Sequence, residues 1–111
     1  KWVSSSNLEA NWNTELAQHS SAEYHTNNLL SSVLFEEASA HVPSNAIVIE
    51  IAPHGLLQAI VKKSLPRAVH IPLTSRFDPN NLMYLLGALG KMYLAGIPVD
   101  LRALYPAATF P

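Results

Sequence analysis

Residues 46–65 read AIVIEIAPHGLLQAIVKKSL, and this stretch predicts the fold. Its first part, residues 46–52, is apolar and rich in β-branched side chains, with Glu50 as the only charge, which is typical of a parallel strand covered on both faces. Pro53-His54-Gly55 then breaks the pattern. From residue 56 onward, apolar side chains recur at helical spacing opposite polar and charged ones. We therefore expect a buried strand that turns into an amphipathic helix.

The alternation of side chains along a strand gives a sharper prediction. Ile49 and Ile51 should share one buried face, and Val48 should lie on the other. A second short strand is predicted at residues 69–73, with Pro72 at an edge or near its end because proline cannot donate to a strand ladder.

Two helices are predicted before the central stretch. Ser6-Asn7-Leu8-Glu9 has the pattern of a capping box. The helix after it should carry a narrow apolar stripe of Leu8, Trp12 and Leu16. A second helix should be capped by Ser32 and should place Glu36-Glu37 near its positively charged end.

One long helix is predicted after the central stretch, at residues 82–94. Lys91 is its only charged residue, so most of its surface should face apolar neighbours rather than water. Gly96 is the expected stop signal. Prolines punctuate the remaining residues, which we expect to form an extended tail that lies on another surface.

Size and composition suggest an incomplete domain. The chain has 111 residues, of which 49% are hydrophobic and 14% are charged, whereas about 25% charged residues is usual in soluble domains. The predicted strands are too few for a parallel sheet covered on both faces. We expect an α/β fold, parallel strands covered by helices, that is cut from a larger domain, and Lys1 in place of an initiator methionine agrees with that expectation.

Charge and composition exclude several classes of protein. The net charge is −1 and the only basic cluster is Lys62-Lys63, so we expect no nucleic-acid partner. There is no cysteine, which removes disulfides and thiolate metal sites. No apolar run approaches the roughly 18 residues of a membrane span, so we expect no membrane partner.

Few residues carry a recognisable chemistry on their own. The sequence has no G-x-S-x-G, GxGxxG or phosphate-binding loop, and its five histidines lack metal-ligand spacing, so we expect no metal. His54 lies at a strand-to-helix turn, where α/β sheets bind ligands, and is a weak candidate for substrate binding; a polar residue at a helix start is the alternative. Glu50 stays unassigned, because a carboxylate at a strand end commonly accepts backbone amides.

The order and spacing of several motifs resemble the C-terminal part of the malonyl/acetyl acyltransferase domain of animal type I fatty acid synthase and, more loosely, polyketide synthase acyltransferases. The motifs are Ser20-Ser21-Ala22-Glu23-Tyr24, Asn27-Asn28-Leu29, Val33-Leu34-Phe35, Glu50-Ile51-Ala52-Pro53-His54 and Leu56-Leu57-Gln58-Ala59. The match continues through residues 89–96 and 104–106 and covers essentially the whole chain.

The resemblance implies a serine-histidine acyl transfer. Malonyl or acetyl would pass from coenzyme A to the phosphopantetheine arm of an acyl carrier domain, with the histidine as general base and then acid. It also implies a cytoplasmic, homodimeric multienzyme in which the segment contacts the rest of the acyltransferase domain, the ketosynthase and the linker domain. No cofactor is expected on the segment itself.

The resemblance assigns one supporting residue and no catalytic one. The family's serine, its malonyl-binding arginine and its histidine all precede a segment like this, so the segment alone should be inactive. Tyr24-His25-Thr26 superficially matches the family's catalytic Tyr-His-Ser, but Asn27-Asn28-Leu29 follows too soon, and we reject His25 as the base. Asn28 stands where a main-chain carbonyl receives a hydrogen bond from the catalytic imidazole.

The resemblance also implies boundaries. Residues 1–6 would end a small ferredoxin-like subdomain, residues 7–99 would belong to the acyltransferase α/β subdomain, and residues 100–111 would begin the following linker. Two alternatives stay open: a non-catalytic module that docks a partner domain, and the same segment of a polyketide synthase.

Overall fold

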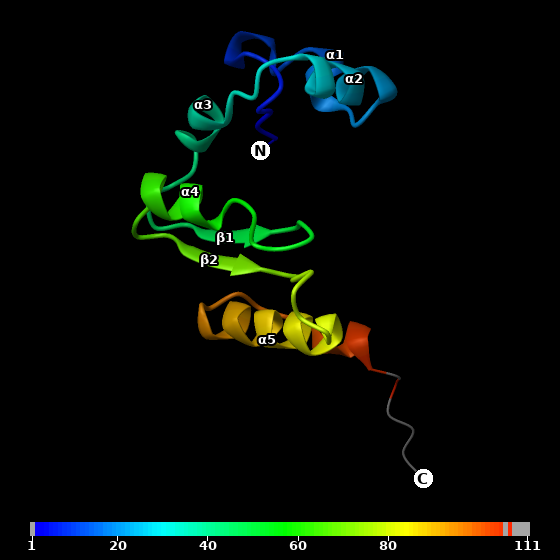
Figure 1. The fold of residues 1–111 in the computed structure, drawn as a ribbon, viewed down its shortest axis with the longest axis vertical. Coiled ribbons are helices and arrows are strands. Elements are labelled where there is room, and N and C mark those ends of the chain that lie inside the picture. Colours follow the sequence, from blue (N-terminus) through cyan, green and yellow to red (C-terminus); the bar gives the residue numbers. More distant parts are fainter. Residues whose placement is uncertain (1, 106, 108–111) are drawn as a thin grey trace. The chain divides into compact units, whose positions relative to one another are not determined.

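The computed structural model describes residues 2–105 and 107, and the chain divides into two compact units, Lys1–Pro43 and Ser44–Pro111. The first unit is helical, and the second contains a small parallel sheet with helices (Figure 1). The elements in chain order are the 3-10 helix η1 (Glu9–Asn11), the helices α1 (Glu15–Gln18), α2 (Ala22–Leu30) and α3 (Phe35–Ser39), the strand β1 (Ile47–Glu50), the helix α4 (Gln58–Ser64), the strand β2 (Val69–Pro72), the helix α5 (Asn81–Leu94) and the 3-10 helix η2 (Leu101–Leu104).

The longest helix of the first unit is α2, and sequence reasoning missed it. The Ser21 hydroxyl caps it by accepting the Tyr24 backbone N–H at 3.1 Å, and Glu23 lies in the first turn, where a negative charge is favourable. Tyr24 is its one buried residue, so α2 has almost no apolar stripe for a periodicity search to detect.

The capping box predicted at Ser6-Asn7-Leu8-Glu9 is wrong. The following turn is the short 3-10 helix η1, Leu8 precedes it without a side-chain cap, and the Ser6 hydroxyl accepts a hydrogen bond from Asn28 instead. The predicted continuous helix is therefore two short pieces, η1 and α1. Of the predicted stripe, Trp12 is buried, and its indole N–H donates to the Ser4 carbonyl at 3.1 Å. Leu8 and Leu16 are 62% and 39% exposed, so the stripe is wrong at these two positions.

The next helix, α3, begins later than the predicted cap. Leu34 precedes the helix without a side-chain cap bond, and Ser32 is exposed and outside it, so the prediction for Ser32 is wrong. Glu36 and Glu37 do lie in the first turn, which confirms that they stand near the positive end of the helix dipole.

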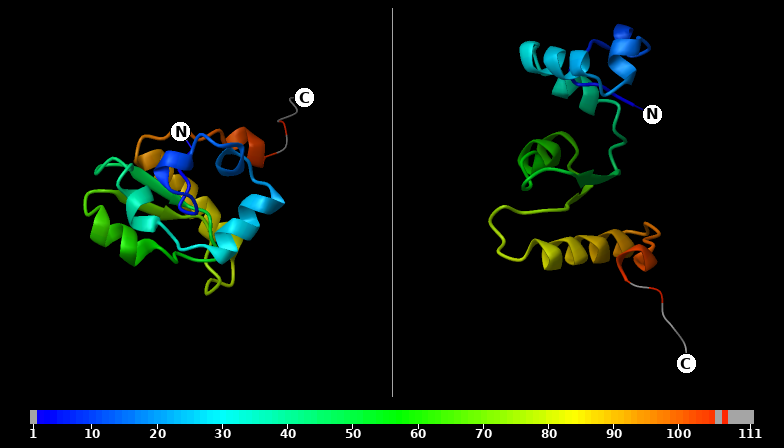
Figure 2. Two further views of the ribbon diagram at one scale, coloured as in Figure 1. Left: turned by 90° about the horizontal axis from the view of Figure 1, so that it is seen from above. Right: turned by 90° about the vertical axis from the view of Figure 1, so that its right-hand side faces the viewer.

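The central stretch folds as predicted into a strand and a helix. β1 and β2 pair in parallel, with Ile47 opposite Val69 and Glu50 opposite Pro72. They lie side by side in Figure 1, and Figure 2 gives two further views of the chain. The pairing confirms the parallel sheet and the place of Pro72 at a strand end. Lys62 and Lys63 lie in the last turn of α4, at the negative end of its dipole.

The predicted burial of β1 is wrong for this chain. Ile49 is 37% exposed and Ile51 is 87% exposed, because β1 ends at Glu50 and only two strands are present among the described residues. Ile71 of β2, at 1% exposure, is instead the buried centre of the sheet. The mixed α/β fold is confirmed, but its apolar faces are only partly covered.

The helix predicted at residues 82–94 is present as α5. Gly96 ends it with φ +87°, and the amides of Gly96 and Ile97 donate to the carbonyls of Tyr93 and Met92, which is the pairing of a Schellman motif. The tail is not fully extended, because η2 forms one 3-10 turn after Asp100. Among the helices within residues 2–105 and 107, none combines the length and the apolar character that a membrane span requires.

Candidate functional site

Polar side chains gather at two places, one in each unit. In the first unit they lie where the N-terminal segment meets the C-terminal end of α2, which carries Asn28. In the second unit they lie where β1 and β2 end, close in sequence to His54. These two places contain or adjoin Asn28 and His54, the residues that the sequence singled out.

Asn28 lies in the last turn of α2, two residues before the helix ends at Leu30. Carbonyl groups in the last turn of a helix have no partner within the helix. Ser31 donates its backbone N–H to the Asn27 carbonyl at 2.9 Å, and among the described residues no hydrogen bond to the Asn28 carbonyl is present. That oxygen is therefore available to an outside donor.

The side chain of Asn28 is hydrogen-bonded to the N-terminal segment. Its Nδ2 donates to the hydroxyl of Ser6, which is only 5% exposed. The neighbouring Asn27 donates its Nδ2 to the main-chain carbonyl of Ser6 at 2.9 Å. Two consecutive asparagines of α2 are thus held by one serine.

Further bonds fix the segment that holds the asparagines. Ser4, 1% exposed, places its hydroxyl 3.1 Å from the hydroxyl of Tyr24 and accepts the Ser6 backbone N–H at 3.1 Å. The Trp12 indole donates to the Ser4 carbonyl at 3.1 Å and to the Asn7 carbonyl at 3.0 Å. Sequence reasoning missed this set of polar groups, although three consecutive serines upstream of an asparagine pair are a usable signal.

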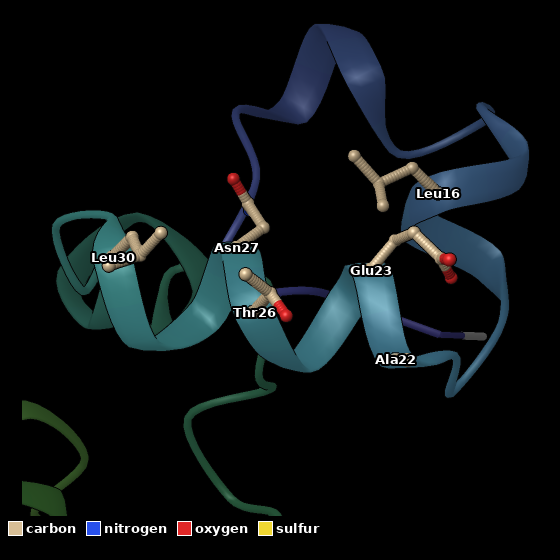
Figure 3. A pocket seen from close by; sticks show the side chains of 6 residues that line it. All are labelled: Leu16, Ala22, Glu23, Thr26, Asn27 and Leu30. Atoms are coloured by element: carbon tan, nitrogen blue, oxygen red, sulfur yellow. The ribbon is translucent and has the colours of Figure 1, made fainter.

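A shallow hollow of about 440 Å³ lies along α2 (Figure 3). Leu16 reaches from α1 over the helix, and the other lining residues belong to α2. They are Ala22, Glu23, Thr26, Asn27 and Leu30. The backbone N–H of Glu23, and then the Ser21 hydroxyl, hydrogen-bond its carboxylate and lower the pKa of Glu23. The hollow holds no nucleophile paired with a base.

His25 has a serine partner, but on the exposed side of α2. Its Nε2 lies 2.8 Å from the hydroxyl of Ser20, and both side chains are exposed. Its ring packs edge-on against Tyr24, with the ring centroids 5.5 Å apart. A nucleophile-base pair normally has a third group that orients the base. We find no such hydrogen-bonding group at His25 among the described residues, so we interpret the pair as a surface contact.

Glu50 is the buried centre of the second place. One of its oxygens accepts the Leu57 backbone N–H at 2.9 Å, which confirms that it receives a backbone amide. The other lies 2.7 Å from Nε2 of His70, and the side chains of Glu50 and His70 are 7% and 2% exposed. Glu50 therefore ties β1 to β2 and to the start of α4.

Sequence reasoning missed the pairing with His70. In the parallel register Val48 lies opposite His70 and Glu50 opposite Pro72, so Glu50 and His70 are diagonal neighbours on one face. The signal for this pair is a single polar residue on each of two neighbouring apolar strands.

His54 lies in the turn after β1 and is half-buried. The His54 ring packs edge-on against the Phe77 ring, with the ring centroids 5.4 Å apart. The guanidinium carbon of Arg76 lies 4.8 Å from the centroid of the Phe77 ring. Nδ1 of His54 is buried without a hydrogen-bond partner in the described part of the chain. Arg76 also donates its backbone N–H to the Pro53 carbonyl at 2.7 Å, which holds the two turns together.

The histidines and carboxylates do not form a metal site. Within residues 2–105 and 107, no group of three or more potential ligands is arranged to hold a metal ion. The described groups that could bind a partner are therefore the Asn28 carbonyl at the end of α2 and the partly buried imidazole of His54 beside the sheet, and both would bind through hydrogen bonds.

Comparison with known proteins identifies the family. Residues 2–99 match the acyl transferase domain family. An erythronolide synthase from Saccharopolyspora erythraea is 36% identical over 87 residues, covering 77% of this chain and 3% of that protein. A probable polyketide synthase from Dictyostelium discoideum is 31% identical over 101 residues, again 77% of this chain and 3% of that protein.

A highly reducing polyketide synthase from Aspergillus fumigatus is 31% identical over 94 residues, covering 77% of this chain and 4% of that protein. The chain thus spans only a small part of the length of these relatives. Because the family match extends over residues 2–99, the chain belongs to the acyl transferase domain family.

Proposed function

We propose that this segment belongs to an acyltransferase of a cytoplasmic, homodimeric fatty acid synthase. The enzyme would transfer malonyl or acetyl from coenzyme A to the phosphopantetheine arm of an acyl carrier domain. Membership of the acyl transferase domain family and the order of motifs from residues 20 to 59 support the proposal. Its partners would be the rest of the acyltransferase domain, the ketosynthase, the linker domain and the carrier domain.

The reaction would use a serine and a histidine outside this chain. The serine oxygen attacks the thioester carbonyl while the imidazole takes the serine proton, and the proton then passes to the departing coenzyme A thiolate. In the second half, the phosphopantetheine thiol gives its proton to the imidazole and attacks the acyl-serine. The acyl group moves to the thiol, and the serine recovers its proton.

Asn28 would act through its carbonyl. An imidazole that donates Nδ1–H to a fixed acceptor keeps Nε2 free to take the serine proton, which is the role a carboxylate has in a triad. The observation that carries this role is the free Asn28 carbonyl in the last turn of α2, on a residue whose side chain is held by buried Ser6.

A polyketide synthase is the second candidate, and the three relatives favour it because their names describe polyketide synthases. The two candidates share the acyl-serine chemistry and differ in the product. Full-length protein supplied with acetyl-CoA, malonyl-CoA and NADPH would release a saturated fatty acid in the first case.

The experiment that tests acyl transfer uses labelled malonyl-CoA and the full-length protein. We expect a covalent acyl-protein that loses its label to added carrier domain, and no labelling of residues 1–111 alone. Absence of any acyl-protein from the full-length chain would overturn the proposal and favour a non-catalytic docking module. Labelling without transfer to a carrier would overturn the proposed acceptor.

Substitutions of Asn28 test the carbonyl role. Asn28→Ala keeps the carbonyl and should slow transfer by at most about 10-fold, whereas Asn28→Pro removes an amide inside α2 and should slow it by more than about 100-fold. Leu29→Ala, at an exposed neighbouring position, is the control. A loss of about 100-fold with alanine would contradict the proposal that the backbone carbonyl carries the role of Asn28.

A further inference from the structure

The side chain of Ser6 is buried although serine is mostly found at protein surfaces. It is 5% exposed, its hydroxyl accepts from Nδ2 of Asn28, and its carbonyl accepts from Nδ2 of Asn27 at 2.9 Å. Both bonds span more than twenty residues of sequence, so they join the N-terminal segment to the end of α2. The two bonds hold the consecutive residues Asn27 and Asn28, and Asn28 carries the free carbonyl.

Ser6 is itself held in place. Its backbone N–H donates to the Ser4 hydroxyl at 3.1 Å, and the Ser4 carbonyl accepts from the Trp12 indole at 3.1 Å. The carbonyl of the intervening Ser5 accepts the Leu34 backbone N–H at 2.7 Å. The segment therefore has a fixed position within the unit to which the end of α2 can be tied.

We propose that Ser6 is a positioning residue for acyl transfer, because its hydroxyl sets the place and direction of the Asn28 carbonyl. The inference rests on the proposed function, in which that carbonyl accepts a hydrogen bond from the catalytic imidazole. The last turn of a helix frays easily, since its carbonyls lack partners. A displacement of about 1 Å in a catalytic group can cost about 100-fold in rate.

Ser6→Ala should remove only part of this constraint. The Ser6 carbonyl still accepts from Asn27, so α2 stays docked while the direct tie to Asn28 is lost. We expect the rate of acyl-serine formation to fall by about 10-fold, less than the full cost of a displaced group. Ser6→Thr keeps a hydroxyl and should recover most of that loss.

The experiment separates positioning from folding by pre-steady-state labelling of the full-length protein with malonyl-CoA. The burst amplitude counts correctly folded sites, and the burst rate reports the chemical step. We expect Ser6→Ala to keep its amplitude and lose rate. The matched control is Ser39→Ala, which deletes a hydroxyl that donates to the Glu36 carbonyl within the first unit, and it should change neither quantity.

Asn28→Ala removes the same bond from its other end without altering the buried serine. If the two residues act through one bond, the double variant should be about as slow as the slower single variant, because effects of paired groups are not additive. A reduced amplitude with an unchanged rate in Ser6→Ala, or full additivity in the double variant, would overturn the positioning role. If wild-type protein forms no acyl-serine, the proposed function itself fails, and the two failures are therefore distinguishable.

Discussion

Among the described residues, each unit of this chain buries three apolar side chains, and the two units differ in the polar groups buried beside them. In Lys1–Pro43 the buried groups include the hydroxyls of Ser4 and Ser6, and directional hydrogen bonds connect the N-terminal segment to α2. In Ser44–Pro111 the buried groups are mainly aliphatic, with Ile71 as the largest fully buried side chain. Hydrogen bonds fix the direction of individual atoms, whereas apolar burial depends chiefly on area and volume.

This difference matters for the proposed chemistry. A carbonyl that must face an imidazole needs directional support, and the first unit supplies it around Asn28. Both units also leave large apolar side chains uncovered, with Leu29 at 84% exposure in the first and Ile51 at 87% in the second. Uncovered apolar side chains of this kind agree with a partial acyltransferase domain whose sheet and helices have further neighbours.

Glu50 is the exception to the apolar character of the second unit, and its loss should have the largest effect there. Glu50→Ala leaves the Leu57 N–H and Nε2 of His70 buried without their partner, which should cost about 4 kcal/mol. Hydrogen exchange of the β1 and β2 amides in the full-length protein measures this cost as faster opening. Glu37→Ala, on the exposed surface of α3, is the control. Equal exchange in the two variants would show that Glu50 does not support the sheet.

Ile71 tests the apolar side of the comparison. Ile71→Ala removes a side chain that is 1% exposed and should destabilise the sheet by about 3 kcal/mol through the cavity it leaves. Ile51→Ala makes the same substitution at a side chain that is 87% exposed in this chain. In the full-length protein further neighbours should cover Ile51, so this variant should cost more than the about 0.5 kcal/mol of a surface site but less than Ile71→Ala. The same exchange measurement applies to both variants. An effect of Ile51→Ala within about 0.5 kcal/mol would mean that no other part of the full-length protein covers that side chain.

Ser21 tests the polar side through a local bond. Ser21→Ala removes the acceptor for the Tyr24 N–H at the start of α2 and should cost about 1 kcal/mol of helix stability. Ser32→Ala, at an exposed serine that caps no helix, should cost less than about 0.5 kcal/mol. Hydrogen-exchange protection of the α2 amides measures the loss of helix stability in both variants. Similar protection in the two variants would contradict the capping role of Ser21.

The sequence predicted the second unit better than the first, and the contacts explain why. The strand, the turn and the helix of residues 46–65 follow from apolar periodicity, and the stop of α5 follows from Gly96. These signals are local. The burial of Ile49 and Ile51 was mispredicted because it depends on neighbouring strands, which a local pattern does not describe.

In the first unit the deciding contacts are remote in sequence. Ser6 has the local pattern of a helix cap, yet its hydroxyl accepts from Asn28, and that long-range bond overrides the local preference. The Asn28 assignment came from family resemblance, and its role stays a prediction. The run of three serines is a signal, but Ser6, which holds Asn28, and Ser4, which holds Ser6, could not be singled out without the fold because serine is mostly found at protein surfaces.

Glu23 should give the smallest effect and the finest test of how polar contacts order α2. The backbone N–H of Glu23 and the Ser21 hydroxyl hold the pKa of its carboxylate below the ordinary value of 4.5. A carboxylate with a lowered pKa in the folded state stabilises that state above its unfolded pKa, and the contribution disappears as pH falls through the folded pKa. Protection of the α2 amides should therefore be slightly lower in Glu23→Gln than in wild type at about pH 7, and the difference should shrink as the pH falls below 4.5. Because Glu23 is fully exposed, added salt should weaken the difference at neutral pH. A difference that persisted at acidic pH would have to come from side-chain packing, and the carboxylate would then have no part in stabilising the helix.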